Sequence, residues 1–92
     1  MVQEVAIFDV TDADAFEKAH QAAKAGIDGV AGQRSIRMTR GIESPNRFIL
    51  LIEWDSIDAH RAAGKTEAFG QWIAAISPYF DGAPRAEHFT DV

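Results

Sequence analysis

Three histidines are the side chains of this chain that are best suited to acid–base chemistry. An imidazole changes charge near neutral pH, so it can take up or release a proton under ordinary conditions. His60 shares a predicted helical face with Ile57 and Ala63 and should point toward a sheet, whereas His88 falls in the middle of the predicted last strand. If both face one cleft, one can act as a base and the other as a hydrogen-bond donor. The alternative is that His60 fills a helix kink near Gly64 and His88 bonds only within the sheet.

Aromatic side chains in the C-terminal half are suited to binding a flat molecule. Phe69, Trp72 and Tyr79 can form an aromatic wall, and the Tyr79 hydroxyl can donate to a ligand oxygen. We expect Trp72 and Tyr79 to contact a substrate. The alternative is that Phe69 and Trp72 form the core stripe of their helix and that Tyr79 packs on the surface.

One arginine is a candidate for binding an anionic ligand. Arg37 lies on the less apolar face of its predicted strand, and a guanidinium can stabilise a phenolate or a carboxylate. The alternative use is a cross-strand ion pair with Glu53 on the neighbouring strand. His20 lies on the apolar stripe of the first predicted helix, where we expect a satisfied, half-buried structural histidine.

Composition excludes several other kinds of site. The chain has no cysteine, which excludes disulfides, cysteine-ligated metals and thiol catalysis. No metal-binding, dinucleotide-binding or phosphate-loop motif occurs, so we expect neither a metal nor a cofactor. The net charge is −5 with the basic residues dispersed, which argues against nucleic acid binding. The absence of a membrane-length apolar run and of a signal-like N-terminus favours a cytoplasmic protein.

The periodicity of the chain predicts a single α+β domain over residues 1–92. Alternating or β-branched runs predict four strands, and two amphipathic regions between them predict helices, the second in two pieces divided near Gly64. The predicted strands are Val2–Val10, Arg34–Arg40, Arg47–Trp54 and Arg85–Val92. This β-α-β-β-α-β order is that of a ferredoxin-like split sandwich, a four-stranded antiparallel sheet with helices on one face.

One strand indicates a homodimer. Phe48, Leu50 and Ile52 face one way, while Ile49 and Leu51 face the other, so this strand is apolar on both sides. A sheet with helices on one face should need an apolar surface on that face only. Each exposed apolar side chain forgoes about 1.5–3 kcal/mol of burial, so a second copy of the sheet packed against the open face is the simplest remedy.

A family resemblance is carried by three segments of the C-terminal half, N-R-F-I-L-L-I-E-W-D-S-I-D-A-H, E-A-F-G-Q-W-I-A-A-I-S-P-Y-F and A-E-H-F. The chain resembles the small antibiotic biosynthesis monooxygenases, and the likeness covers most of it, from Val2 to Val92. This resemblance implies a dimeric α+β barrel with a pocket between the helices and the sheet of each protomer. It also implies oxidation of phenolic or quinol-like substrates by O2 without a cofactor.

A second branch of that superfamily degrades haem with an Asn on the first strand and a Trp and a His on the second helical region. Here the first strand has no Asn, and no His follows Trp72 before His88, so we do not expect haem degradation.

Three functional hypotheses follow from the residues and the resemblance. The first is a cofactor-independent monooxygenase for a small aromatic, phenolic or quinol-like molecule, with His60 and His88 as catalytic residues and Trp72, Tyr79 and Arg37 as substrate contacts. The second is a non-catalytic protein of the same fold that binds a small hydrophobic ligand or has a structural role. The third is an isomerase or a haem-handling protein of this fold.

Overall fold

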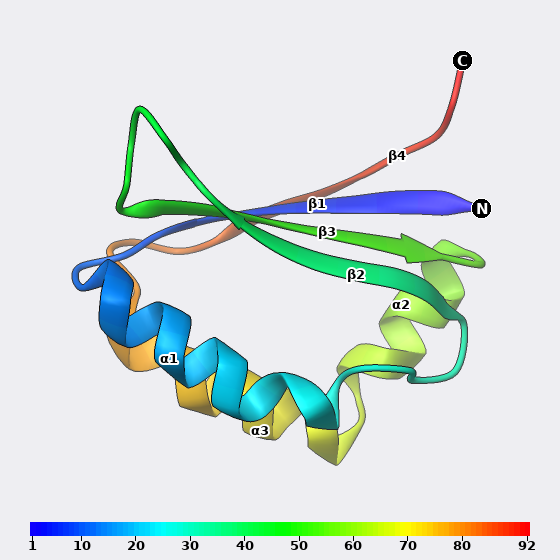
Figure 1. The fold of residues 1–92 in the computed structure, drawn as a ribbon. Helices are drawn as coiled ribbons and strands as arrows, with labels where there is room; N and C mark the ends of the chain where they lie inside the picture. The colour runs from blue at the N-terminus through cyan, green and yellow to red at the C-terminus, as the bar shows by residue number, and fades with distance from the viewer.

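The secondary structure follows the predicted β-α-β-β-α-β order, and the second helical region is divided into two helices (Figure 1). The computed structural model describes residues 1–92. In chain order it contains β1 (Val2–Asp9), α1 (Ala13–Ala23), the short 3-10 helix η1 (Lys24–Gly26), β2 (Gln33–Arg40), β3 (Arg47–Trp54), α2 (Ile57–Gly64), α3 (Glu67–Ile76), the 3-10 helix η2 (Ser77–Tyr79) and β4 (Arg85–Phe89).

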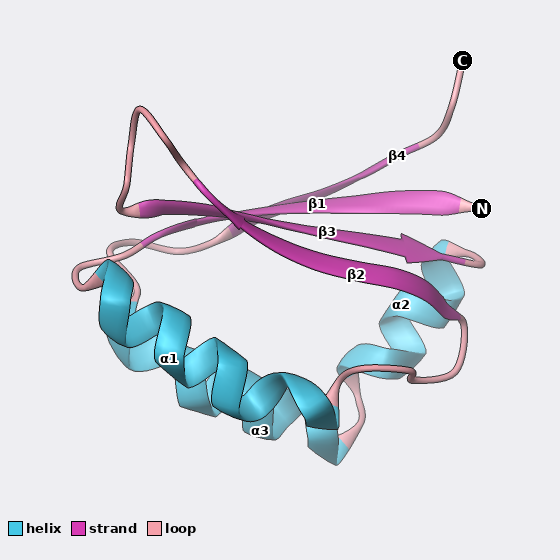
Figure 2. Cartoon of the chain, viewed as in Figure 1, coloured by secondary structure: helices cyan, strands magenta, loops and turns pink.

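The strands form one antiparallel sheet in the order β2-β3-β1-β4, and the helices cover only one of its faces (Figure 2). Helices α1 and α3 lie side by side beneath the sheet, and α2 lies near the end of β3. This arrangement confirms the predicted ferredoxin-like α+β fold.

The last strand is shorter than predicted. It ends at Phe89, which is paired with Gln3 of β1, rather than continuing to Val92. Because β1 begins at Val2, almost no neighbouring strand remains for the residues beyond Phe89 to pair with.

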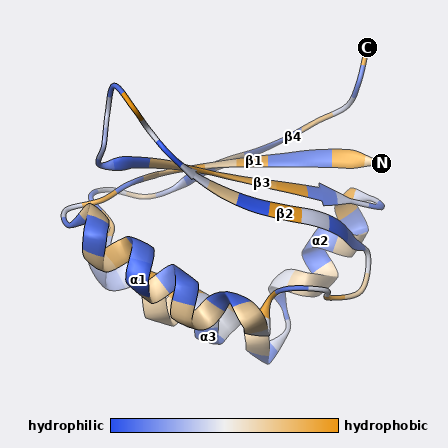
Figure 3. Cartoon of the chain, viewed as in Figure 1, coloured by the Kyte–Doolittle hydropathy of each residue, from blue (hydrophilic) through white to orange (hydrophobic).

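The two faces of β3 differ as the sequence predicts. Phe48, Leu50 and Ile52 are almost completely buried under the helices, whereas Ile49 and Leu51 lie on the open face and remain partly exposed. Figure 3 shows hydrophobic residues along this strand. The core therefore lies between the sheet and the helices, and a second apolar surface remains on the other side of the sheet.

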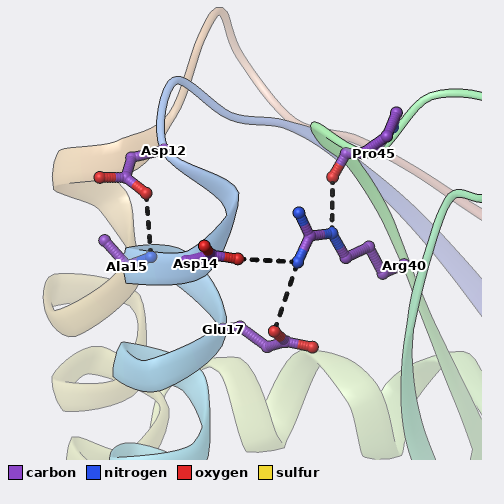
Figure 4. Close-up of polar contacts among 6 residues, drawn as sticks. All are labelled: Asp12, Asp14, Ala15, Glu17, Arg40 and Pro45. Atoms are coloured by element: carbon purple, nitrogen blue, oxygen red, sulfur yellow. Dashed lines mark hydrogen bonds and ion pairs between the residues drawn. The ribbon is translucent and has the colours of Figure 1, made fainter.

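Side-chain caps fix where the helices begin. The Asp12 carboxylate accepts a hydrogen bond from the Ala15 amide at 3.1 Å and caps α1 (Figure 4). Close by, Arg40 Nη1 lies 3.0 Å from the Asp14 carboxylate and 3.5 Å from that of Glu17. These contacts hold the start of α1 against the end of β2.

The hydroxyl of Thr66 stabilises the break between α2 and α3. Thr66 Oγ1 accepts from the Phe69 amide at 3.3 Å and donates to the Ala63 carbonyl at 2.7 Å. It therefore caps α3 and also satisfies the end of α2, which sets the angle between the two helices. Ser56 caps the start of α2 by accepting from the Ala59 amide at 3.0 Å.

Candidate functional site

The structure brings His60 and His88 into direct contact. His60 is one turn into α2, and His88 is on the helix-facing side of β4. His60 Nδ1 lies 2.6 Å from His88 Nε2, and the ring centroids are 4.9 Å apart in an edge-to-face arrangement. The two imidazoles therefore share one hydrogen bond, which is the geometry needed to pass a proton between them.

A buried carboxylate lies on the other side of His60. Glu4, on β1 directly opposite His88, is only 5 % exposed, and its Oε1 lies 3.3 Å from His60 Nε2. The same oxygen accepts a hydrogen bond from Trp54 Nε1 at 2.9 Å. The Trp54 indole also stacks on the His60 ring, with an angle of 11° between the planes. Three strands and α2 thus fix the position of the central imidazole.

Glu4 and Trp54 were not predicted from the sequence as site residues. The sequence nevertheless contains one indication of the role of Glu4, because Glu4 lies on the same face of β1 as Ala6 and Phe8, both of which are buried. An acidic residue at a core-facing strand position requires a polar partner. The identity of that partner depends on how α2 crosses the sheet, which the sequence pattern does not fix.

The electrostatics keep His60 ready to accept a proton. Burial lowers the pKa of His60 below its ordinary value of 6.5; the nearby Glu4 carboxylate opposes this shift, and His88 adds to it. His60 is therefore neutral at neutral pH. Because an ionised carboxylate can only accept hydrogen bonds, the arrangement favours the hydrogen on His60 Nε2, with Nδ1 accepting from His88.

The Glu4–His60 contact opens on an apolar cleft between the sheet and the helices. The cleft has a volume of about 400 Å³, and its walls include Phe8, Leu50, Phe69, Trp72 and Ile73. Glu4 and His60 are the ionisable residues on its walls. His88 does not line the cleft itself. Ala86, two residues earlier on the same face of β4, does line it. A ligand in this cleft would meet an aromatic and aliphatic surface with polar groups at one place.

Trp72 both lines the cleft and belongs to the core. Its side chain is 3 % exposed, and its Nε1–H donates to His20 Nδ1 at 3.1 Å. The indole N–H is therefore already bonded, and Trp72 can offer a ligand only part of its ring. Burial, together with the charge of Lys24, lowers the pKa of His20, so this histidine is neutral and structural, as its place in the sequence suggests.

Tyr79 and Arg37 lie away from the histidine pair. Tyr79 is part of η2, packs partly buried against the core and is not among the residues lining the cleft. Pro78, in the same turn, carries the chain out of α3 and takes this side chain away from the cleft. Arg37 is exposed on the open face of the sheet, opposite Leu51.

The suggested Arg37–Glu53 ion pair is wrong. Glu53 is paired with Ser35 instead, and its carboxylate accepts from the Ser35 hydroxyl at 2.7 Å. Pairing is regular from Arg40–Phe48 to Ser35–Glu53, so this register is set by the turn between the two strands, whose geometry the sequence pattern does not fix.

The structure contains no group of three His, Cys, Asp or Glu side chains that could hold a metal ion. None of its helices combines the length and the apolar character needed to span a bilayer.

The fold and the cleft define a ferredoxin-like α+β domain with an aromatic-walled pocket. The sequence pattern of the antibiotic biosynthesis monooxygenases matches residues 8–75 of the chain, and the protein belongs to this family. Over their full lengths, the chain is 28 % identical to the uncharacterized protein YczJ of Bacillus subtilis.

Solved structures of similar proteins share the fold. A Caulobacter crescentus structure named for the same family is 28 % identical, with a TM-score of 0.87 over 99 % of this chain and 89 % of its own. SnoaB, a cofactor-independent oxygenase from Streptomyces nogalater, is 21 % identical, with a TM-score of 0.85 over 99 % of this chain and 92 % of its own.

Proposed function

We propose that this protein is a cofactor-independent monooxygenase that oxidises a small aromatic, phenolic or quinol-like molecule with O2. The observation that carries the proposal is the hydrogen-bonded His60–His88 pair at the end of an apolar, aromatic-walled cleft. Membership of a family named for monooxygenases supports it, as does the similarity in fold to an oxygenase that works without a cofactor.

The residues at the cleft supply what such a reaction needs from the protein. Removal of a proton from the substrate gives an electron-rich anion that can react with O2 directly. The pair acts as one base: His88 takes up that proton at Nδ1 and passes the proton on its Nε2 across the 2.6 Å contact to Nδ1 of the neutral His60. The Glu4 carboxylate, 3.3 Å from His60, stabilises the positive charge that then forms on the pair.

The overall reaction balances without another reactant. For a substrate methylene such as that of an anthrone, one O2 converts the CH2 group to a carbonyl and releases one water. One oxygen atom enters the product and the other leaves as water, while the substrate itself supplies all the electrons. The apolar walls exclude bulk water, which favours reaction of the anion with O2 over its reprotonation.

Oxygen uptake with a panel of anthrones and hydroquinones tests this proposal. We expect wild-type protein to consume O2 without added cofactor, and His60→Ala and His88→Ala to lose about 10²-fold or more of the rate. His20→Asn is the matched control, because it removes a histidine outside the pair and retains an acceptor for Trp72. Unchanged turnover in both alanine variants would contradict the assignment of the pair. Ligand binding without turnover by the wild-type protein would favour the non-catalytic alternative.

We also propose that the protein is a homodimer formed through the open face of the sheet. Val5 and Ile7 of β1 lie beside Ile49 and Leu51 of β3 on that face, and all four are only partly buried. Phe89 of β4 extends the patch and is 48 % exposed. An apolar surface along three adjacent strands is suited to an identical surface on a second copy.

A further inference from the structure

Only one of the two carboxylate oxygens of Glu4 contacts donors in the protein. Its Oε1 accepts from Trp54 Nε1 at 2.9 Å and faces His60 Nε2 at 3.3 Å, whereas its Oε2 contacts no donor in the protein. Burial of a carboxylate is costly unless its oxygens are hydrogen-bonded. Half of the hydrogen-bonding capacity of this carboxylate therefore remains available.

The unused oxygen is accessible, and Glu4 lines the candidate cleft. Every fully buried polar side-chain atom in the structure has a hydrogen-bond partner. Because Oε2 has no partner, it is not fully buried. Glu4 is one of the residues that line the cleft, beside Ala6 and His60. The small exposed part of this 5 % exposed residue thus includes an acceptor oxygen, and His60 is the other ionisable residue on the cleft wall.

We infer that Glu4 Oε2 selects the ligand of this cleft by accepting a hydrogen bond from an aromatic hydroxyl. This inference deepens the proposed function and rests on it for the aromatic class of the ligand, because it names the group by which the ligand is recognised. The hydroxyl is held beside His60, while the ring lies against the wall formed by Phe69 and Trp72. An ether or a ketone at the same position has no hydrogen to donate and leaves the oxygen unpaired.

The orientation of the carboxylate makes a reversal of this preference testable. The Trp54 indole N–H can only donate, so it requires an acceptor at the Oε1 position. In Glu4→Gln, the amide oxygen must therefore occupy that position, which directs the amide NH2 into the cleft. The substitution preserves shape and replaces an acceptor by a donor at the one place where a ligand meets it.

The experiment compares the binding of naphthol and of its methyl ether, methoxynaphthalene, followed by ligand fluorescence and by amide shifts in NMR spectra. We expect wild-type protein to bind naphthol about tenfold or more tightly than the ether, as is typical of a hydrogen bond to a charged group. In Glu4→Gln we expect the ether to bind at least as tightly as naphthol. Glu43→Gln, the same substitution in the exposed β2–β3 loop, should retain the wild-type preference.

Three results would overturn the inference. They are equal binding of the two probes by wild-type protein, no binding of naphthol up to its solubility limit, and a wild-type preference that survives in folded Glu4→Gln. If Glu4→Gln does not fold, the wild-type comparison alone decides. A naphthol preference that Glu4→Gln removes, without oxygen uptake by the wild type, would uphold the role of Glu4 and contradict only the proposed reaction.

Discussion

His60 lies between groups that act on its protonation in opposite directions. Burial and the neighbouring His88 favour the neutral imidazole, and Glu4 favours the charged one. Burial is the largest of these effects, so the resting state at neutral pH is an uncharged proton acceptor. Once a proton arrives, the Glu4 carboxylate stabilises it. A carboxylate behind a histidine thus allows the base to be neutral before the reaction and charged during it.

The lowered pKa of His20 predicts how the stability of the protein depends on pH. Burial lowers its pKa in the folded protein, whereas in the unfolded chain it titrates near 6.5. The unfolded chain therefore binds the proton more readily. The contribution of His20 to stability is complete above pH 6.5 and is lost as the pH falls toward the pKa of His20 in the folded protein. Protonation of Nδ1 also removes the acceptor that Trp72 uses.

Urea unfolding measures this effect. We expect the free energy of unfolding of wild-type protein to fall between about pH 7.5 and about pH 5.5, and that of His20→Asn to fall less. The asparagine oxygen can accept from Trp72 but does not titrate in this range. His20→Ala should be destabilised by about 1–3 kcal/mol at all of these pH values, because the buried indole N–H loses its partner. Identical pH slopes for wild type and His20→Asn would rule out His20 as the source.

The candidate site was predictable in part. His60 and His88 were predicted because an imidazole is suited to proton transfer near neutral pH and because His60 shares the sheet-facing side of its helix; the periodicity left open the face of the last strand on which His88 lies. Glu4 was missed because a single acidic residue in a strand gives no indication of its partner. The position of Tyr79 depends on the direction of the chain after Pro78, which no periodicity describes.

At the level of elements, local signals predicted most of the fold. The residues before the three α-helices, Asp12, Ser56 and Thr66, are of types that favour helix starts, and such a local signal needs no tertiary contact because a cap acts within one helical turn. The pairing of β2 with β3 was not predictable. It depends on the geometry of the turn between Arg40 and Arg47, and a shift of one residue would exchange the two faces of the strand.

A glycine next to α2 provides a test of how this helix is positioned. Gly32 has a φ of +81°, and an added Cβ would lie only 2.6 Å from the Cβ of Ala59, the residue before His60. Gly29 has a similar φ of +74°, but an added Cβ there would meet no atom within 4 Å. The two glycines therefore share the backbone requirement and differ only in the steric contact.

We expect Gly29→Ala to cost about 1–2 kcal/mol for the left-handed backbone alone. Gly32→Ala should cost more, because α2 must also move away from the loop. Thermal unfolding compares the two variants, and oxygen uptake shows whether moving α2 disturbs His60. Equal melting temperatures for the two variants would show that the contact with Ala59 has no effect on stability.

At the level of the whole molecule, the sheet is the element whose burial is incomplete. One face carries the core, and the other exposes apolar side chains of β1 and β3 at its centre, with charged residues on the flanking strands, such as Arg37 of β2 and Glu87 of β4. The proposed two-fold dimer would bury the apolar centre and leave the charged flanks at the rim, as in most protein interfaces.

A single charge at the centre of that face tests the dimer. In Val5→Glu, the new carboxylate would lie between Leu51 and Glu87 and would be buried at an apolar interface without a partner, so we expect a monomer at micromolar concentrations. Arg61→Glu, on the exposed surface of α2, should leave the oligomeric state unchanged. Sedimentation analysis distinguishes these outcomes. A monomeric wild-type protein would contradict the proposed interface directly.

Isotope incorporation from labelled O2 tests the proposed oxygenase activity most directly. Wild-type protein, freed of metals and given an anthrone without cofactor, should yield a quinone that contains one labelled oxygen atom for each O2 consumed. His60→Ala should produce almost none, and His20→Asn should match the wild type. A quinone whose new oxygen comes from water, or equal labelling with and without His60, would contradict the proposal.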